Sequence, residues 1–250
     1  MAGRNCADIV FCIDSSASMQ PCLDAVKSNI SKLLEGLGGD GQGTTWDVRF
    51  DYLAFCDSND GVHRLVSTRL GATDIVRKIY TAPDAAGFFT RDLHEFSTEL
   101  AKVKADGEEM HLFALDIAMD FPWRPSADCH RVVVLLSDEP VESGVEVEAQ
   151  VAQVEAIIAK TMEKRIKLFI VAPESEVFYR LAAADRCEYT DVESTQDGLQ
   201  SVDFSRMLAA IGKSVSVSQS YDGGSNTPVP HFGQESMSGV TRATMGADNA

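Results

Sequence analysis

The feature that most constrains this chain is an apolar segment of strand length that ends on an acid and runs into a helix. It reads Asp-Ile-Val-Phe-Cys-Ile-Asp-Ser-Ser-Ala-Ser-Met over residues 8–19, and a helical pattern follows it. Asp14, Ser16 and Ser18 therefore fall on the loop that leaves the C-terminal end of a buried strand. Ligands bind at that edge of open α/β sheets. Carboxylates and hydroxyls are hard oxygen donors, so the loop predicts a site for Mg2+, Mn2+ or Ca2+.

The alternation of strands and helices continues along the chain. The strongest strand signal is Arg131–Leu136, with Val-Val-Val-Leu-Leu at its centre, which is typical of a strand buried on both faces. The other expected strands are 7–14, 46–56, 62–68, 167–172 and 186–190, and the expected helices are 20–37, 72–80, 92–103, 110–121, 145–164, 175–184 and 201–211. This alternation implies right-handed βαβ units. We predict a doubly wound α/β fold with a mainly parallel six-strand sheet, one antiparallel edge strand at 62–68, and helices on both faces.

Length, composition and charge limit the domain count and the class of partner. A chain of 250 residues that is 44% hydrophobic fits one α/β domain, and the Ser-, Gly- and Pro-rich character after Gly212 predicts a domain over 1–212 and a flexible, low-complexity tail over 213–250. A net charge of −16 argues against binding nucleic acid or an anionic membrane, because phosphates would be repelled. No signal peptide, membrane span or Cys-x-x-Cys pair is visible, so we expect a cytoplasmic location and reduced thiols.

A second apolar strand also ends on a carboxylate, at Asp138. If this strand lies beside the first, Asp14 and Asp138 project from the same edge, which is costly unless a cation compensates. The alternative is that Asp138 only caps the following turn. A third group of acids, with Asp106 and Glu109, begins a predicted helix. They either complement the helix dipole or face the same cation.

The Asp-x-Ser-x-Ser pattern at 14–18, together with Ser137-Asp138, resembles the metal-ion-dependent adhesion site of von Willebrand factor A domains. The resemblance covers roughly residues 7–212. Asp106 and Glu109 match the Asp and Glu of the Gly-Gly-Gly-Asp-x-Pro-Glu segment in an intracellular, hemicentin-like subgroup. In this chain the glycines around 104–105 are replaced, and Glu108 stands in place of the proline.

The resemblance implies a Rossmann-like fold and a protein–protein interaction through a metal site. It implies as ligands Asp14, Ser16, Ser18, Asp106, Glu109 and Asp138. The cofactor would be Mg2+, or Mn2+ or Ca2+, with one position left for a carboxylate of a protein partner. By family analogy, partners include AAA+ ATPases and kinases. The alternatives are a scaffold domain whose site is empty or purely structural and, third, a metal-assisted hydrolase.

Signals for catalysis are weak, so we expect no enzyme. The serines lack a Gly-x-Ser-x-Gly elbow, and the first strand-to-helix turn lacks Gly-x-Gly-x-x-Gly. Among the histidines, only His111, one turn into a predicted helix, is expected near the site. Trp123 and Arg124 lie in a proline-framed turn, where they fit either an interface hot spot or packing onto the domain.

Overall fold

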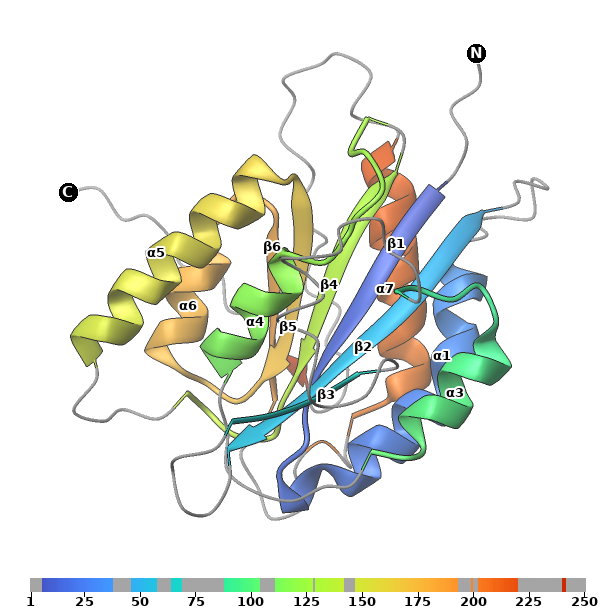
Figure 1. The fold of residues 1–250 in the computed structure, drawn as a ribbon, viewed down its shortest axis with the longest axis horizontal. Helices are drawn as coiled ribbons and strands as arrows, with labels where there is room; N and C mark the ends of the chain where they lie inside the picture. The colour runs from blue at the N-terminus through green and yellow to red at the C-terminus, as the bar shows by residue number, and fades with distance from the viewer. Residues whose placement is uncertain are drawn as a thin grey trace.

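The structure of the protein is a computed structural model that describes residues 6–37, 46–57, 64–68, 88–103, 111–127, 129–141, 147–192, 199, 202–219 and 240–241. These residues form one sheet with helices on both faces (Figure 1). The strand order is β3-β2-β1-β4-β5-β6-β7. β1 therefore lies between β2 and β4, and it is parallel to both.

Five parallel strands make the body of the sheet: β1 (Cys6–Asp14), β2 (Asp47–Asp57), β4 (His130–Leu136), β5 (Ile166–Ala172) and β6 (Cys187–Val192). The predicted parallel α/β architecture is confirmed. β3 (Arg64–Thr68) pairs antiparallel with β2, and the two-residue β7 (Val240–Thr241) pairs antiparallel with β6. Among the described residues the sheet thus has seven strands where the sequence predicts six, because two residues are too few to give a strand pattern.

Two helical layers cover the sheet (Figure 1). One layer contains α1 (Gln20–Leu37), α3 (Leu93–Leu100) and α7 (Phe204–Gln219), and the other contains α4 (His111–Met119), α5 (Val147–Glu163) and α6 (Glu176–Ala182). Alternate residues of β1 serve the two cores: Phe11 packs on the α1 side and Cys12 on the α4 side. Burial on both faces explains why this strand is apolar throughout except at Asp8 and Asp14.

The last helix differs most from its prediction. α7 continues to Gln219, although the sequence pattern ends it at Ile211, and it crosses the domain boundary predicted at residue 212. Gly212 does not end the helix, because Val215 beyond it is wholly buried in the α1-side core and its packing stabilises the last turns. The predicted helix over 72–80 lies outside the described residues, as does the predicted tail beyond α7 apart from β7. No helix in the described ranges is long and apolar enough to cross a membrane.

Candidate metal-ion site

Asp14 stands at the C-terminal end of β1, where the chain turns tightly. Its Oδ1 accepts a hydrogen bond from the Ser16 backbone N–H at 2.7 Å, as in an Asx turn. The intervening Ser15 fixes the turn to β2, since its N–H and its hydroxyl both donate to the Phe55 carbonyl, at 2.8 and 2.9 Å. Asp14 is wholly buried. The loop after β1 is therefore held by hydrogen bonds before any ligand binds.

The two predicted serine ligands follow at the start of a 3-10 turn, Ala17–Met19, that leads into α1. Ser16 Oγ and Ser18 Oγ lie 3.3 Å apart; Ser16 is buried and Ser18 is exposed. Ser16 caps the turn without a side-chain hydrogen bond to the backbone. Adjacent oxygens are about 2.9 Å apart around Mg2+ and about 3.4 Å apart around Ca2+, given the usual metal–oxygen distances. The two hydroxyls are hydrogen-bonded to each other, and their spacing also matches that of neighbouring ligands of one cation.

The end of β4 brings the second acid to the same edge. Because Ile13 pairs with Leu136 in parallel register, the residues after them also lie side by side, and Ser137 Oγ donates to Asp14 Oδ2 at 2.9 Å. Asp138 follows and is 7% exposed. Its Oδ1 is buried and has no hydrogen-bond partner among the described residues. An unpartnered buried carboxylate oxygen is costly, and a cation is one way to satisfy it.

The electrostatics of this edge fit a cation. Burial raises the pKa of Asp14 to about 6, and the charge of Asp138 adds to this, while hydrogen bonds from Ser16 and Ser137 oppose it. Two carboxylates that disfavour each other's charge would both be stabilised by a divalent ion between them. Carboxylate and hydroxyl oxygens are also the donors that hard divalent cations prefer. The four predicted ligands that the structure describes therefore fit the divalent cation that the resemblance implies.

His111, the first residue of α4, lies directly against this cluster. Its Nε2 is 2.7 Å from Ser137 Oγ and 3.8 Å from Asp14 Oδ2. The ring is packed edge-to-face against Phe55 and Phe178, with centroids 5.5 and 5.6 Å away. Burial lowers the pKa of His111 to about 3, so the imidazole is neutral at physiological pH. The sequence predicts that this histidine lies near the site but gives no sign of its contact with Ser137.

Two predicted ligands, Asp106 and Glu109, lie outside the described residues. Their contribution stays a prediction. Within the described part of the chain, no group of three or more His, Cys, Asp or Glu side chains is arranged to hold a metal. The described site consists instead of two carboxylates and two hydroxyls.

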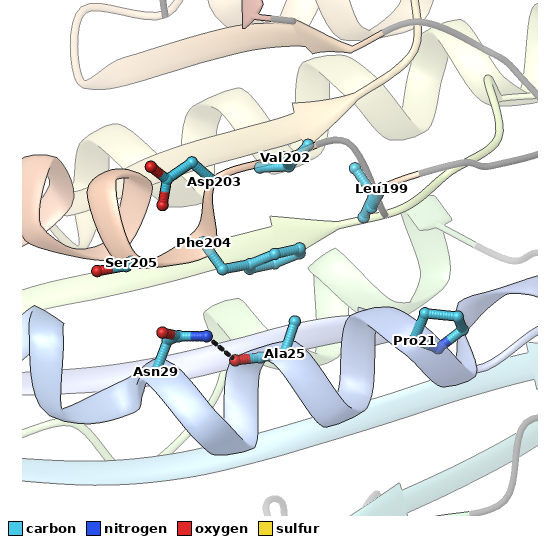
Figure 2. Close-up of a pocket in the computed structure, with 8 residues that line it drawn as sticks. All are labelled: Pro21, Ala25, Asn29, Leu199, Val202, Asp203, Phe204 and Ser205. Carbon is cyan, nitrogen blue, oxygen red and sulfur yellow. Dashed lines mark hydrogen bonds between the residues drawn. The ribbon is translucent and has the colours of Figure 1, made fainter. Parts of the chain in front are cut away.

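A pocket of about 350 Å³ lies elsewhere, between α1 and the start of α7 (Figure 2). It is lined by Pro21, Ala25, Asn29, Leu199, Val202, Asp203, Phe204 and Ser205. None of these is a predicted site residue, so this pocket does not mark the metal site.

The proline-framed turn after α4 serves packing at the opposite edge of the sheet. Arg124 Nε donates to Asp8 Oδ1 at 2.7 Å, and its Nη1 donates to Asp47 Oδ2 at 2.7 Å. Trp123 lies against Phe89 and donates from Nε1 to the Met119 carbonyl. These contacts agree with the packing alternative for both side chains.

Comparison with known proteins concerns the fold. No family model matches the chain. Among curated proteins, alpha-protein kinase vwkA of Dictyostelium discoideum is 25% identical over 139 residues, which are 54% of this chain and 19% of that protein. Among solved structures, a von Willebrand factor type A protein from Catenulispora acidiphila matches with a TM-score of 0.54 and 14% identity, over 84% of this chain and 42% of that one. The chain has the von Willebrand factor A (vWA) fold.

Two further structures share this fold. One is proximal thread matrix protein 1 from the mussel byssus, solved with a zinc-occupied metal-ion-dependent adhesion site (MIDAS) motif. It matches with a TM-score of 0.52 and 14% identity, over 86% of this chain and 46% of that one. The human COPII-coat protein Sec24c matches with a TM-score of 0.53 and 11% identity, over 86% of this chain and 33% of that one. The chain thus spans less than half of each solved protein.

Proposed function

We propose that this domain binds a protein partner through a divalent cation at the C-terminal edge of its sheet. Asp14, Ser16, Ser18 and Asp138 would hold the ion, and Asp106 and Glu109 would complete its shell. The observation that carries the proposal is Asp138 Oδ1, which is buried beside a second buried carboxylate and has no hydrogen-bond partner among the described residues. Its burial without a donor supports a cation as the intended partner.

The cation would be Mg2+, as the resemblance implies, with Mn2+ or Ca2+ as alternatives, because all three prefer oxygen donors. Zn2+ is included in the test, since the mussel protein with this fold was solved with a zinc-occupied MIDAS motif. Bound between the serine hydroxyls and the acids, the ion supplies a Lewis-acidic position that a carboxylate can fill. We therefore propose that the partner presents an exposed Asp or Glu side chain to this position.

The proposal is one of binding without catalysis. Ser137 is hydrogen-bonded to both His111 and Asp14, but it is wholly buried. A hydroxyl in that position is closed to a substrate, so the His–Ser–Asp contact does not support a nucleophile. Five of the cysteines, Cys6, Cys12, Cys22, Cys129 and Cys187, are free thiols, which supports the reducing, cytoplasmic environment that we propose for the protein.

Calorimetric titration of metal-stripped protein with Mg2+, Mn2+, Ca2+ and Zn2+ tests the site. We expect saturable binding to the wild type and none to the Asp14→Asn/Asp138→Asn variant, which keeps the side-chain shape but removes both charges. The matched control is Asp24→Asn/Glu155→Gln, which removes two exposed charges from other parts of the surface. Equal binding by wild type and the Asp14→Asn/Asp138→Asn variant would contradict the proposal.

Partner capture then separates the remaining alternatives. If binding to an acidic partner is lost with chelator and in the Asp14→Asn/Asp138→Asn variant, the interaction function is supported. Capture that is unchanged in both conditions would point to the scaffold alternative, with binding elsewhere on the domain. Turnover of phosphate esters that depends on Asp14 would instead favour the hydrolase.

A further inference from the structure

The hydroxyl of Ser137 has more neighbours than it has protons. Its Oγ lies 2.9 Å from Asp14 Oδ2, 2.7 Å from His111 Nε2 and 3.1 Å from the Glu139 carbonyl oxygen, and it also accepts from the Glu139 N–H at 3.1 Å. A serine hydroxyl can donate only one hydrogen bond. Which neighbour receives the proton determines the hydrogen-bonding role of His111.

Chemistry assigns that proton to Asp14. An ionised carboxylate only accepts hydrogen bonds, and a hydrogen bond to a charge is stronger than one to the neutral Glu139 carbonyl. The Asp14 contact is also the shorter of the two, at 2.9 against 3.1 Å. Once Ser137 donates to Asp14, its contact with His111 needs a donor on the histidine. Nε2 of His111 must therefore carry the hydrogen.

We propose that His111 is a positioning residue of the metal site, which acts through Ser137. Its Nε2–H donates to Ser137 Oγ, so that the serine proton points at Asp14 Oδ2 while the Ser16 N–H holds Oδ1. Asp14 is then fixed by two donors in its charged form and in one orientation before the cation arrives. This inference rests on the proposed function, because it concerns how the same site is prepared for the cation.

Packing alone does not account for a histidine at this position. The ring is 3% exposed and contacts the aromatic rings of Phe55 and Phe178. A leucine or phenylalanine would fill such a space without burying two ring nitrogens. The donor to Ser137 gives the polar ring a purpose that an apolar side chain could not serve.

Three substitutions at one position test the inference. His111→Gln places an amide N–H near the position of Nε2, His111→Asn places one near Nδ1, and His111→Leu provides no donor. We expect cation affinity to fall roughly 10- to 100-fold in His111→Leu and His111→Asn, the usual loss when a residue that supports a metal ligand is removed. His111→Gln should restore affinity to within a few-fold of the wild type. Phe178→Leu, which alters packing around the ring but keeps the donor, should bind the cation normally.

A double-mutant cycle and a spectrum give independent readouts. In the Ser137→Ala background, His111→Leu should cause no further loss of affinity, because its effect passes through the serine. Long-range 15N NMR at neutral pH should show the Nε2–H tautomer for His111, whose signals are identified by their absence in His111→Gln. Finding the Nδ1–H tautomer, or normal cation affinity in His111→Leu, would overturn the role proposed for His111 but not the proposed function. Failure of the wild type to bind any cation would instead overturn the proposed function.

Discussion

Replacing Arg124 with alanine should strongly destabilise the fold, and the structure supplies a matched comparison. Arg124 and Arg91 both form ion pairs with Asp47, at 2.7 and 2.8 Å. They differ in burial: the Arg124 side chain is 18% exposed and also pairs with the wholly buried Asp8, whereas Arg91 is 63% exposed. Arg124 Nη2 further donates to the Ala7 and Asp47 carbonyls.

The expected magnitudes follow from this difference. Arg124→Ala leaves Asp8 with Arg49 as its remaining charged partner among the described residues, and it removes a donor from two backbone carbonyls. Removing one partner of a buried ion pair costs about 3–5 kcal/mol, and the retained Arg49 favours the lower end of that range. Arg91→Ala removes an exposed pair and should cost at most about 1 kcal/mol. Since domains have a free energy of unfolding of about 5–15 kcal/mol, the first loss is large.

Urea denaturation followed by circular dichroism measures both variants. With an m-value of about 3 kcal/mol/M, Arg124→Ala should lower the midpoint by about 1 M, and Arg91→Ala by about 0.3 M or less. Arg124→Lys should fall between them, because an ammonium group keeps the charge but not the planar fork of donors. If Arg124→Ala costs no more than Arg91→Ala at equal m-values, the contacts of Arg124 with Asp8 and Asp47 do not stabilise the fold as argued. The interface alternative for Arg124 would then regain support.

Further predictions concern acid stability, thiol reactivity and the last helix. Although burial opposes ionisation, hydrogen bonds from Arg49 and Arg124 hold the pKa of Asp8 below its usual value. The charged Asp8 therefore stabilises the folded state fully above the unfolded pKa of about 3.9, and this stabilisation is lost as the pH falls through the lower folded pKa. In urea denaturation, the midpoint of the wild type should exceed that of Asp8→Asn by the same amount from pH 5 to 7 and by less near pH 3. An equal gap at pH 3 and pH 7 would contradict this prediction. Burial raises the pKa of the Cys12 and Cys22 thiols, so mass spectrometry should find both unmodified by iodoacetamide in the native protein and alkylated after unfolding. Val215→Ala should cost about 1–2 kcal/mol, judged from buried methyl deletions, and no loss in a urea melt would show that the helix end is unimportant to the core.

The sequence was sufficient to predict those parts of the fold that follow from local pattern. The α1 boundaries agree with the prediction, because an unbroken periodic face ends at a glycine pair. The strand at 130–136 was predicted from its run of β-branched and leucine residues. The end of α7 could not be predicted, because a buried contact of Val215 outweighs the local preference of Gly212.

In the candidate site, too, some features follow from local sequence pattern and others depend on tertiary packing. The sequence predicts that Asp14 and Asp138 project from one edge only if their two strands are neighbours in the sheet. The pairing of β1 with β4 meets that condition. The contact between His111 and Ser137 depends on how α4 packs on the sheet, which no spacing in the chain encodes. The link from Arg124 to Asp8 spans 116 residues and was equally invisible. Contacts between side chains on different elements require the tertiary structure.

The strand order also has a consequence for how the protein is made. Asp14 and Ser137 are neighbours in space but are separated by 123 positions in the chain, and synthesis proceeds at about 5–20 residues per second. A growing chain that has not yet released β4 therefore carries Asp14, Ser16 and Ser18 without Ser137 and Asp138. If the site binds its cation, tight binding becomes available only after β4 has paired with β1, and at a concentration 100 times its dissociation constant the ion adds about 2.7 kcal/mol to the folded state. A partner that requires the cation would then recognise chains in which β4 has paired with β1 and ignore shorter ones.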